Sequence, residues 1–357
     1  MTDKNKILHI VEAMGGGVFT YLVELTNALI EEYDIYIAYA TRKQTPKNYK
    51  DYFDSRIHLI EVKNFARAIN FSKDIKALFE IKKIAERIEP NVIHLHSSKA
   101  GALGRIAFDG KTPVFYTPHG YSFLMEDCKL LNRIIYKRIE AVCGKRKCIT
   151  ISCSRGEHEE SLKLTKHATY VDNGINIKKL QDIIDKAEKE EHSFTVFTLG
   201  RICYQKNPTV FNSIAELFPD IKFIWIGDGE LRDELRSPNI TITGWVDRNT
   251  AIRYAVNADV FLLPSRWEGL PISLLEAMYM KKKCIVSNVI GNRDVIYNDR
   301  NGFVCSNLDE FVKAINESQS ENDVLIENAY QDIIQKYNTK VMAKQYRDNY
   351  EIVLKRS

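Results

Sequence analysis

One stretch, Glu268-Gly269-Leu270-Pro271-Ile272-Ser273-Leu274-Leu275-Glu276, places two glutamates eight positions apart across a loop-to-helix junction. Pro271 marks the first turn of the helix, because the N–H that proline lacks would be unpaired there anyway. At about 1.5 Å of rise per residue the two acids lie roughly 12 Å apart along the axis. Carboxylate pairs of glycoside hydrolases stand only about 5–9.5 Å apart. The spacing instead suits two acids at opposite ends of one extended ligand, with the helix N-terminus between them as an anion site.

Short β-rich runs alternate with helical runs before and after a turn-prone stretch at residues 172–176. This alternation predicts βαβ units and an α/β fold with parallel sheets. Strands are expected at residues 7–11, 35–39, 57–62, 92–95, 114–117, 147–151, 194–199, 222–226, 240–243, 260–263, 283–286 and 302–305. Helices are expected at residues 19–31, 73–88, 130–143, 178–191, 308–318, 322–336 and 340–354.

The same pattern predicts two Rossmann-like, doubly wound domains that face each other across a cleft. Their expected bounds are residues 1–172 and 193–339, joined by a linker at 173–192, with the last helix, 340–357, packing back onto the first domain. Ligands of such sheets bind at the carboxyl ends of the strands, and most of the polar motifs of this chain fall there.

Composition describes an ordinary globular protein: 357 residues, 45% of them hydrophobic and 27% charged. No apolar run approaches 18 residues and no signal-peptide core is visible, so the expected location is the cytoplasm. The seven cysteines lack a CxxC pair, which favours reduced thiols over a zinc site. A net charge of +4 is too small to imply a nucleic-acid partner.

Two cations follow the first strand of the second half, in the segment Leu199-Gly200-Arg201-Ile202-Cys203-Tyr204-Gln205-Lys206. Arg201 could bind phosphate oxygens through its guanidinium fork, and Lys206 could act as a point charge. The alternative is that both are ordinary solvated loop charges. Together with the paired glutamates they favour diphosphate binding, and a sugar nucleotide combines a diphosphate with sugar and ribose hydroxyls.

Glycine-containing turns stand at several other strand ends. Gly15-Gly16-Gly17 follows the first strand, where it could admit a phosphate to the backbone or form only a tight turn. It lacks the GxGxxG spacing of dinucleotide-binding proteins. Gly227 and Gly229, and likewise Gly244 with Trp245, could border a nucleotide, or they could serve turn geometry and core packing.

Histidines stand at two strand ends of the first half. His119, before Gly120, could reach a ligand as a hydrogen-bond donor or proton carrier, although a lone histidine is more often structural. His94 and His96 share one strand face, and Ser97 or Ser98 is expected to cap the next helix. Because no third ligand stands nearby in the sequence, we expect no metal site.

Residues 129–147 carry seven basic side chains and one acid, Glu140, a net charge of 7 − 1 = +6. An apolar stripe of leucines and isoleucines accompanies them, at positions 130, 131, 134, 135 and 139. A basic amphipathic helix of this kind could rest on an anionic membrane or pack as any surface helix does.

With these motifs in order, nearly the whole chain resembles the GT-B glycosyltransferases of family 4, the large retaining family. The most specific part of the resemblance is an ordered set of motifs: Gly200-Arg201, Lys206-Asn207, Gly227-Asp228-Gly229, Gly244-Trp245 and the two glutamates. The segments 96–101 and 116–120 are similar to those of bacterial capsule, exopolysaccharide and O-antigen members. One departure is Asn176, where an aspartate is commoner.

The resemblance implies roles for matching residues, all of which are expectations. Arg201 and Lys206 would bind the donor diphosphate, Glu268 and His119 would lie beside the donor sugar, and Glu276 would hold the ribose. Donor contacts would also come from Gly16, Gly17, Gly227, Gly244, Trp245, Gly269, Leu270 and Pro271. The acceptor side would comprise Gly15, Ser97, Ser98 and Lys99, so the first domain would bind the acceptor and the second the donor.

The resemblance further implies a retaining transfer of a hexose or N-acetylhexosamine, most often from a UDP-linked donor, with no metal or other cofactor. The acceptor would be a growing glycan on a polyprenyl diphosphate, and the segment 129–147 would touch the inner face of the membrane. Two alternatives remain: a sugar-nucleotide epimerase of the same architecture, and a non-catalytic sugar-nucleotide-binding subunit of a membrane assembly.

Overall fold

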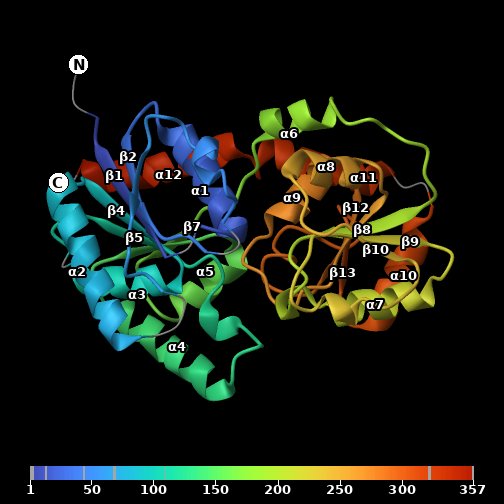
Figure 1. Ribbon diagram of the computed structural model, residues 1–357, viewed down its shortest axis with the longest axis horizontal. Helices are drawn as coiled ribbons and strands as arrows, with labels where there is room; N and C mark the ends of the chain where they lie inside the picture. Colours follow the sequence, from blue (N-terminus) through green and yellow to red (C-terminus); the bar gives the residue numbers. More distant parts are fainter. Residues whose placement is uncertain are drawn as a thin grey trace. The chain divides into compact units, whose positions relative to one another are not determined.

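The computed structural model describes residues 4–12, 14–42, 45–66, 70–108, 110–320 and 323–355. The chain divides into two compact units, each with its own parallel sheet and covering helices (Figure 1). The first unit comprises Met1–Leu124, Cys128–Asn173 and Thr339–Ser357. The second comprises Met125–Asp127 and Gly174–Asn338.

The first unit contains a seven-stranded sheet in the order β3-β2-β1-β4-β5-β6-β7. Its strands are β1 (Lys6–Val11), β2 (Asp34–Tyr39), β3 (His58–Glu61), β4 (Val92–His96), β5 (Val114–Thr117), β6 (Ile149–Ser152) and β7 (Ala168–Tyr170). Its helices are α1 (Gly16–Leu29), α2 (Phe71–Ile88), α3 (Ser98–Ala107), α4 (Leu130–Cys143), α5 (Arg155–Leu162) and α12 (Thr339–Leu354). The chain reverses its direction of winding between β1 and β4, so this is the switch point of the sheet.

Two apolar layers enclose that sheet because successive strand residues point to opposite faces. Ile7 belongs to the cluster that includes residues of α1 and α12, among them Tyr346. Its neighbour Leu8 belongs to the cluster that includes residues of α2 and α3, among them Ile81. Figure 1 shows α1 and α12 on one side of the sheet and α2 and α3 on the other.

The second unit contains a six-stranded sheet in the order β10-β9-β8-β11-β12-β13. Its strands are β8 (Thr195–Leu199), β9 (Lys222–Ile226), β10 (Ile240–Ile242), β11 (Val260–Leu263), β12 (Lys283–Ser287) and β13 (Phe303–Cys305). Its helices are α6 (Ile177–Ile184), α7 (Pro208–Leu217), α8 (Arg248–Val256), α9 (Ile272–Tyr279), α10 (Leu308–Ser318) and α11 (Asp323–Gln335). Short 3₁₀ turns of the chain are η1 (Tyr49–Tyr52), η2 (Ser122–Leu124), η3 (Tyr204–Lys206) and η4 (Arg232–Glu234). The switch point of this sheet lies between β8 and β11.

One expected helix is shorter than predicted, and one strand was missed. The helix expected at 178–191 is α6, which ends at Ile184, because residues 188–191 are exposed charged side chains with no apolar surface to bury. The three-residue strand β7 was not predicted, because its residues 168–170 are only partly buried and lack an apolar run.

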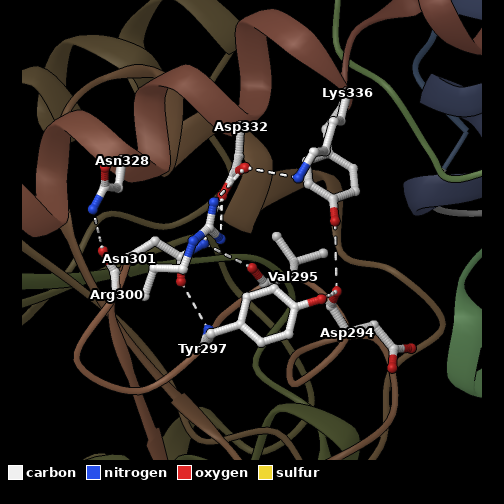
Figure 2. A network of polar contacts seen from close by, with 9 residues as sticks. Asp294, Val295, Tyr297, Arg300, Asn301, Asn328, Asp332 and Lys336 are labelled. Carbon is white, nitrogen blue, oxygen red and sulfur yellow. Dashed lines mark hydrogen bonds and ion pairs between the residues drawn. The ribbon is translucent and has the colours of Figure 1, made fainter.

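A polar network fixes the loop between β12 and β13 on α11 (Figure 2). The carboxylate of Asp332 accepts hydrogen bonds from Arg300 at 2.9 and 3.0 Å and from Lys336 at 3.1 Å. Asn301 donates to that carboxylate and to the carbonyl of Val295, both at 2.9 Å. Burial opposes ionisation of Asp332, but these donors hold its pKa below the ordinary value. The loop is thereby held in one conformation where it meets the candidate site described next.

Candidate functional sites at the two switch points

Lys206 and Glu268 form an ion pair at the switch point of the second unit. Lys206 ends the turn η3 after β8, and its Nζ donates to Glu268 Oε1 at 2.6 Å. Gln205 Nε2 donates to Glu268 Oε2 at 3.3 Å and to the carbonyl of Trp267 at 3.0 Å. The side chains of Lys206 and Glu268 are only 16% and 7% exposed, so neither charge is well hydrated. The pair joins the loops that follow β8 and β11.

Glycines let the turn after β9 pack closely against the backbone of the loop after β8. A Cβ at Gly227 would lie 2.2 Å from the carbonyl oxygen of Gly200, and one at Gly229 would lie 2.1 Å from that of Ile202. Gly227 has φ +140° and Gly244 has φ +73°, conformations that L side chains rarely adopt. The predicted glycines at 227 and 244 therefore have at least a structural task in this unit.

The loop from Gly269 to Pro271 leads into α9. Pro271 stands at the N-cap position, one residue before the helix, and Leu270 is buried. A Cβ at Gly291 would lie 2.2 Å from the carbonyl oxygen of Gly269, so the β12–β13 loop packs against this segment. The network around Asp332 in Figure 2 thus supports the backbone beside Glu268.

Glu276 lies inside α9 with its side chain 3% exposed, and Arg248 NH2 donates to its Oε1 at 2.6 Å. Arg248 opens α8 and was not singled out in the sequence. The one feature of the sequence that could have drawn attention to Arg248 is its position, three residues after Trp245. A ribose hydroxyl that bonded Glu276 would share the carboxylate with this arginine.

Arg201 and Trp245 lie at the surface of the second unit. The side chain of Arg201 is 33% exposed, and its Nε stands 3.9 Å from Glu230 Oε2, a loose contact. Trp245 is 65% exposed, so the core-packing alternative for this residue was wrong. Both side chains are available to a ligand.

The glycine loop of the first unit opens α1 beside the β1–β4 switch point. Gly15 is the N-cap residue of α1, and Gly16 and Gly17 are its first two residues. Space around the Gly16 and Gly17 Cβ positions is open to at least 4 Å. A ligand could therefore approach this backbone closely.

Residues 97–99 begin α3 at the end of β4. Ser97 takes the N-cap position with φ +68°, but its side chain makes no capping hydrogen bond, so that detail of the prediction was wrong. Ser98 Oγ accepts from Ser122 Oγ at 2.9 Å. Lys99 is held by Asp74 at 2.7 Å and by the carbonyl of Ala66 at 2.5 Å, and therefore points toward α2.

His119 follows β5 in a left-handed conformation, with φ +56°. Glu157 supports this turn: its carboxylate accepts from the backbone N–H of Gly120 at 2.6 Å and from that of Cys153 at 2.8 Å. Burial raises the pKa of Glu157, and these two N–H groups oppose the rise. The ring of Tyr21 packs edge-on against His119 with centroids 4.5 Å apart. Ring and backbone of His119 are thus both held in place.

Three further histidines, His9, His94 and His96, lie buried beside it, and the sequence analysis had singled out only the last two. The expectation that His94 and His96 have no third potential ligand nearby was wrong, because the parallel register of β1 and β4 sets His9 opposite His94. Ligand atoms of His9, His94 and His96 lie within 4.8 Å of one another. Both ring nitrogens of His94 are already in hydrogen bonds, to Tyr350 OH at 2.6 Å and Thr117 Oγ1 at 2.9 Å. Among the described residues, hydrogen bonds therefore hold His94 of this buried histidine cluster in place.

Solved structures share this fold over the full length of the chain. Sucrose-phosphate synthase of Thermosynechococcus elongatus has a TM-score of 0.84 and 17% identity, with 99% and 100% of the two chains covered. HepE of Anabaena, in complex with UDP and glucose, has a TM-score of 0.76 and 15% identity, with 97% and 99% covered. At such identities the likeness concerns the fold alone. These likenesses confirm the expected GT-B fold, with two α/β units that each contain a parallel sheet.

Sequence comparisons then give the family. Residues 15–179 match the model of Glycosyltransferase Family 4, and residues 193–320 match that of glycosyl transferases group 1. An Escherichia coli relative, UDP-Gal:alpha-D-GlcNAc-diphosphoundecaprenol alpha-1,3-galactosyltransferase, is 30% identical over 337 residues, which cover 84% of this chain and 85% of the relative. A capsular polysaccharide biosynthesis glycosyltransferase of Staphylococcus aureus is 23% identical, with 87% and 89% covered. The chain belongs to glycosyltransferase family 4, as its motifs predicted, and glycosyl transfer is its activity.

Proposed function

We propose that the protein moves a hexose or N-acetylhexosamine from a UDP-linked donor to a hydroxyl of a glycan on a polyprenyl diphosphate, with retention and without a metal. The Escherichia coli relative is named for UDP-Gal and a diphosphoundecaprenol-linked GlcNAc acceptor. A Campylobacter jejuni relative, 28% identical over 213 residues, is named for a diphospho-undecaprenol-linked acceptor and an N-acetylgalactosamine donor. These names support the substrate classes proposed here. They support neither the epimerase nor the non-catalytic alternative.

The observation that carries this proposal is the Lys206–Glu268 pair at the switch point. Breakage of a sugar–diphosphate bond places negative charge on the leaving phosphate and positive charge on the anomeric carbon. Lys206 offers a cation to the phosphate, and Glu268, 2.6 Å away, offers a carboxylate to the sugar side. The N-terminus of α9, which begins three residues after Gly269, adds its partial positive charge. The pair thus has the two charges that the transition state requires.

Arg201, a second cation at the end of β8, would bind the diphosphate once the donor is present. The leaving phosphate could then take the proton of the acceptor hydroxyl as that hydroxyl attacks on the same face of the sugar. The new bond forms where the old one breaks, so the anomeric configuration is kept and no covalent enzyme intermediate is needed. Glu276 and Arg248 would hold the ribose end of the nucleotide.

The test is transfer from UDP-galactose, UDP-glucose, UDP-N-acetylglucosamine and UDP-N-acetylgalactosamine to GlcNAc-diphosphoundecaprenol. We expect turnover with one of these donors, an α-linked product by NMR, and unchanged rates in EDTA. UDP at a hundred times its dissociation constant should add about 2.7 kcal/mol of stability. A β-linked product would contradict retention, and loss of activity in EDTA would contradict metal independence. Formation of an epimer without acceptor would establish the epimerase alternative.

We also propose that α4 rests on an anionic membrane. Of its fourteen residues only Glu140 and Cys143 are buried. Leu130, Leu131 and Val142 are 71%, 66% and 65% exposed, so the apolar stripe expected from the sequence does not pack into the core. Basic side chains at positions 129, 133, 137, 138 and 145–147 surround it. Among the described residues no helix is long and apolar enough to cross a bilayer. A basic amphipathic helix of this kind can lie on the surface of an anionic membrane.

Leu130→Gln with Leu131→Gln is expected to weaken binding to phosphatidylglycerol-containing vesicles by about 10-fold or more. Burial of one leucine is worth about 1.5–3 kcal/mol, and both side chains are exposed in the free protein. Vesicle co-sedimentation measures the effect. Leu217→Gln, on α7 and 54% exposed, is the matched control that should bind as the wild type does. Equal loss in both variants, or equal binding to neutral and anionic vesicles, would refute this membrane contact.

A further inference from the structure

His9 and His96, which are both buried, form a hydrogen-bonded chain that ends at His119. His9 Nδ1 stands 2.9 Å from His96 Nε2, and His96 Nδ1 stands 3.1 Å from His119 Nε2. His9 lies on β1, His96 at the end of β4 and His119 just after β5, so the chain runs across the switch point of the first unit. His119 is the residue of the three that is partly exposed.

Burial favours the neutral form of each ring in the chain. Burial lowers the pKa of His9 and of His119 to about 3, and it holds the pKa of His96 well below its ordinary value. A neutral imidazole has one N–H donor and one nitrogen acceptor. Each of the two hydrogen bonds needs one donor and one acceptor. All three rings must therefore carry their proton on the same nitrogen, either all on Nδ1 or all on Nε2.

The surroundings of His9, at the buried end of the chain, favour one of these two tautomeric states. His9 Nε2 is buried and has no hydrogen-bond partner among the described residues. In the all-Nε2–H state it would be an unpaired buried N–H, whereas in the all-Nδ1–H state it would be an unpaired acceptor. Orphaned N–H groups are the rarer of the two in folded proteins. The end of the chain at His9 therefore favours the state in which every Nδ1 is protonated.

We propose that His96 and His9 are positioning residues that hold His119 in its Nδ1–H tautomer, so that His119 presents a hydrogen-bond donor to a hydroxyl of the donor sugar. This inference rests on the proposed function and on the place beside the donor sugar that the family resemblance implies for His119. In a histidine the protonated nitrogen is set by the hydrogen bond that the other nitrogen makes. His119 Nε2 is occupied by His96, which leaves Nδ1 as the ring nitrogen for the ligand, and the residue is partly exposed. The same chain keeps the proton from moving to Nε2, where the sugar would meet a lone pair instead.

The tautomer is measured on the full-length protein without any donor. Long-range ¹H–¹⁵N correlation spectra of ring-labelled histidines distinguish the Nδ1–H tautomer from the Nε2–H tautomer. Variants that each lack one histidine assign the signals. We expect protonated Nδ1 and unprotonated Nε2 for His9, His96 and His119 near neutral pH. A protonated Nε2 at His119, or an imidazolium in the chain, would overturn the proposal. So would a stoichiometric metal ion in the purified protein, because the ion would take the nitrogen lone pairs that these hydrogen bonds use.

Two isosteric substitutions at position 96 separate the hydrogen bond from packing. His96→Leu removes the partner of His119, whereas His96→Asn sets an amide near the place of Nδ1 that can still donate to His119 Nε2. Loss of such a supporting partner typically costs about 10- to 100-fold in activity. We expect that loss in kcat for His96→Leu with UDP-galactose, with KM nearly unchanged and Nε2–H appearing at His119. His96→Asn should recover most of kcat and the Nδ1–H form.

His94→Leu is the matched control, because His94 is equally buried on β4 but bonds Thr117 and Tyr350 outside the chain. It should lower the melting temperature and leave the tautomer of His119 unchanged. Wild-type kcat in His96→Leu, or an equal drop in kcat for the leucine and asparagine variants, would overturn the proposal. If the wild type transferred sugar from no donor, the proposed function would fail, while the spectra would still decide the tautomer.

Discussion

Lys206→Met is expected to lower kcat for sugar transfer by about 10²- to 10³-fold. A single positioned donor to developing negative charge is worth about 2.7–4 kcal/mol in the transition state. Lys206 is well placed for that role, because its side chain is only 16% exposed and its Nζ bonds Glu268 at 2.6 Å. Methionine keeps the length of the side chain and removes the charge. Steady-state transfer from UDP-galactose to GlcNAc-diphosphoundecaprenol measures the effect, and UDP-induced thermal shifts report the accompanying loss of donor affinity.

The double variant Lys206→Met/Glu268→Gln separates catalysis from charge balance. The single substitution leaves Glu268 buried without its ion pair, which is costly in stability. The double variant removes both charges, so its melting temperature should return toward that of the wild type while kcat stays low. If kcat also returned, neutralisation of Glu268 would be the sole task of Lys206. Lys344→Met, which removes an exposed lysine on α12, should change neither quantity.

Arg105→Met is expected to destabilise the first unit by about 3–5 kcal/mol, the usual result of breaking a buried ion pair from one side. Arg105 on α3 donates to Glu140 on α4 at 2.7 Å, and the two side chains are 2% and 4% exposed. Tyr116 on β5 donates to the same carboxylate at 2.9 Å, and its ring lies 4.0 Å from the guanidinium carbon. Burial disfavours the charge on Arg105, but Glu140 holds the pKa of the guanidinium above its ordinary value. The variant leaves a buried carboxylate with a single neutral donor.

Calorimetry can follow this loss, and the transition of the second unit can be recognised by its shift with UDP. Arg105→Met/Glu140→Gln should regain a large part of the lost stability, because the glutamine still accepts from Tyr116 and carries no charge. Arg347→Met breaks a pair with Glu32 whose side chains are 35% and 37% exposed, and it should cost only about 0–1 kcal/mol. Equal losses for Arg105 and Arg347 would show that burial does not set the cost here.

The fold could be predicted from the sequence because parallel strands buried on both faces are continuous apolar runs. The strands expected at 114–117, 222–226 and 260–263 have the observed bounds, as do the helices expected at 130–143 and 308–318. The site motifs could also be located from the sequence, because glycines and cations follow the predicted strands. Prediction failed at β7 and beyond Ile184, where the side chains bury little apolar surface. Packing does not restrict the choice of residues there, so the sequence shows no periodic pattern.

Contacts between distant segments could not be predicted from local pattern. His9 meets His94 through the register of two strands, Arg248 reaches Glu276 from the neighbouring helix, and Gly291 packs on Gly269 from another loop. Each of these residues looks ordinary in its own stretch of sequence. The chemistry of both switch points depends on such pairings, so the sequence indicated the strand ends but not the partners. The roles assigned to the site residues stay predictions until variants are measured.

Helix α12 completes the first unit with residues that are synthesised after the whole of the second unit. It packs along α1, and Tyr346 and Tyr350 are fully buried in that unit, the latter bonded to His94 at 2.6 Å. Domains that form during translation usually finish in the order of their synthesis. Here the first unit must wait for α12, while all of the second unit except residues 125–127 is a single segment, 174–338, that can fold earlier. A truncated chain that stops before Thr339 should therefore be captured by chaperones or proteases through its incomplete N-terminal half.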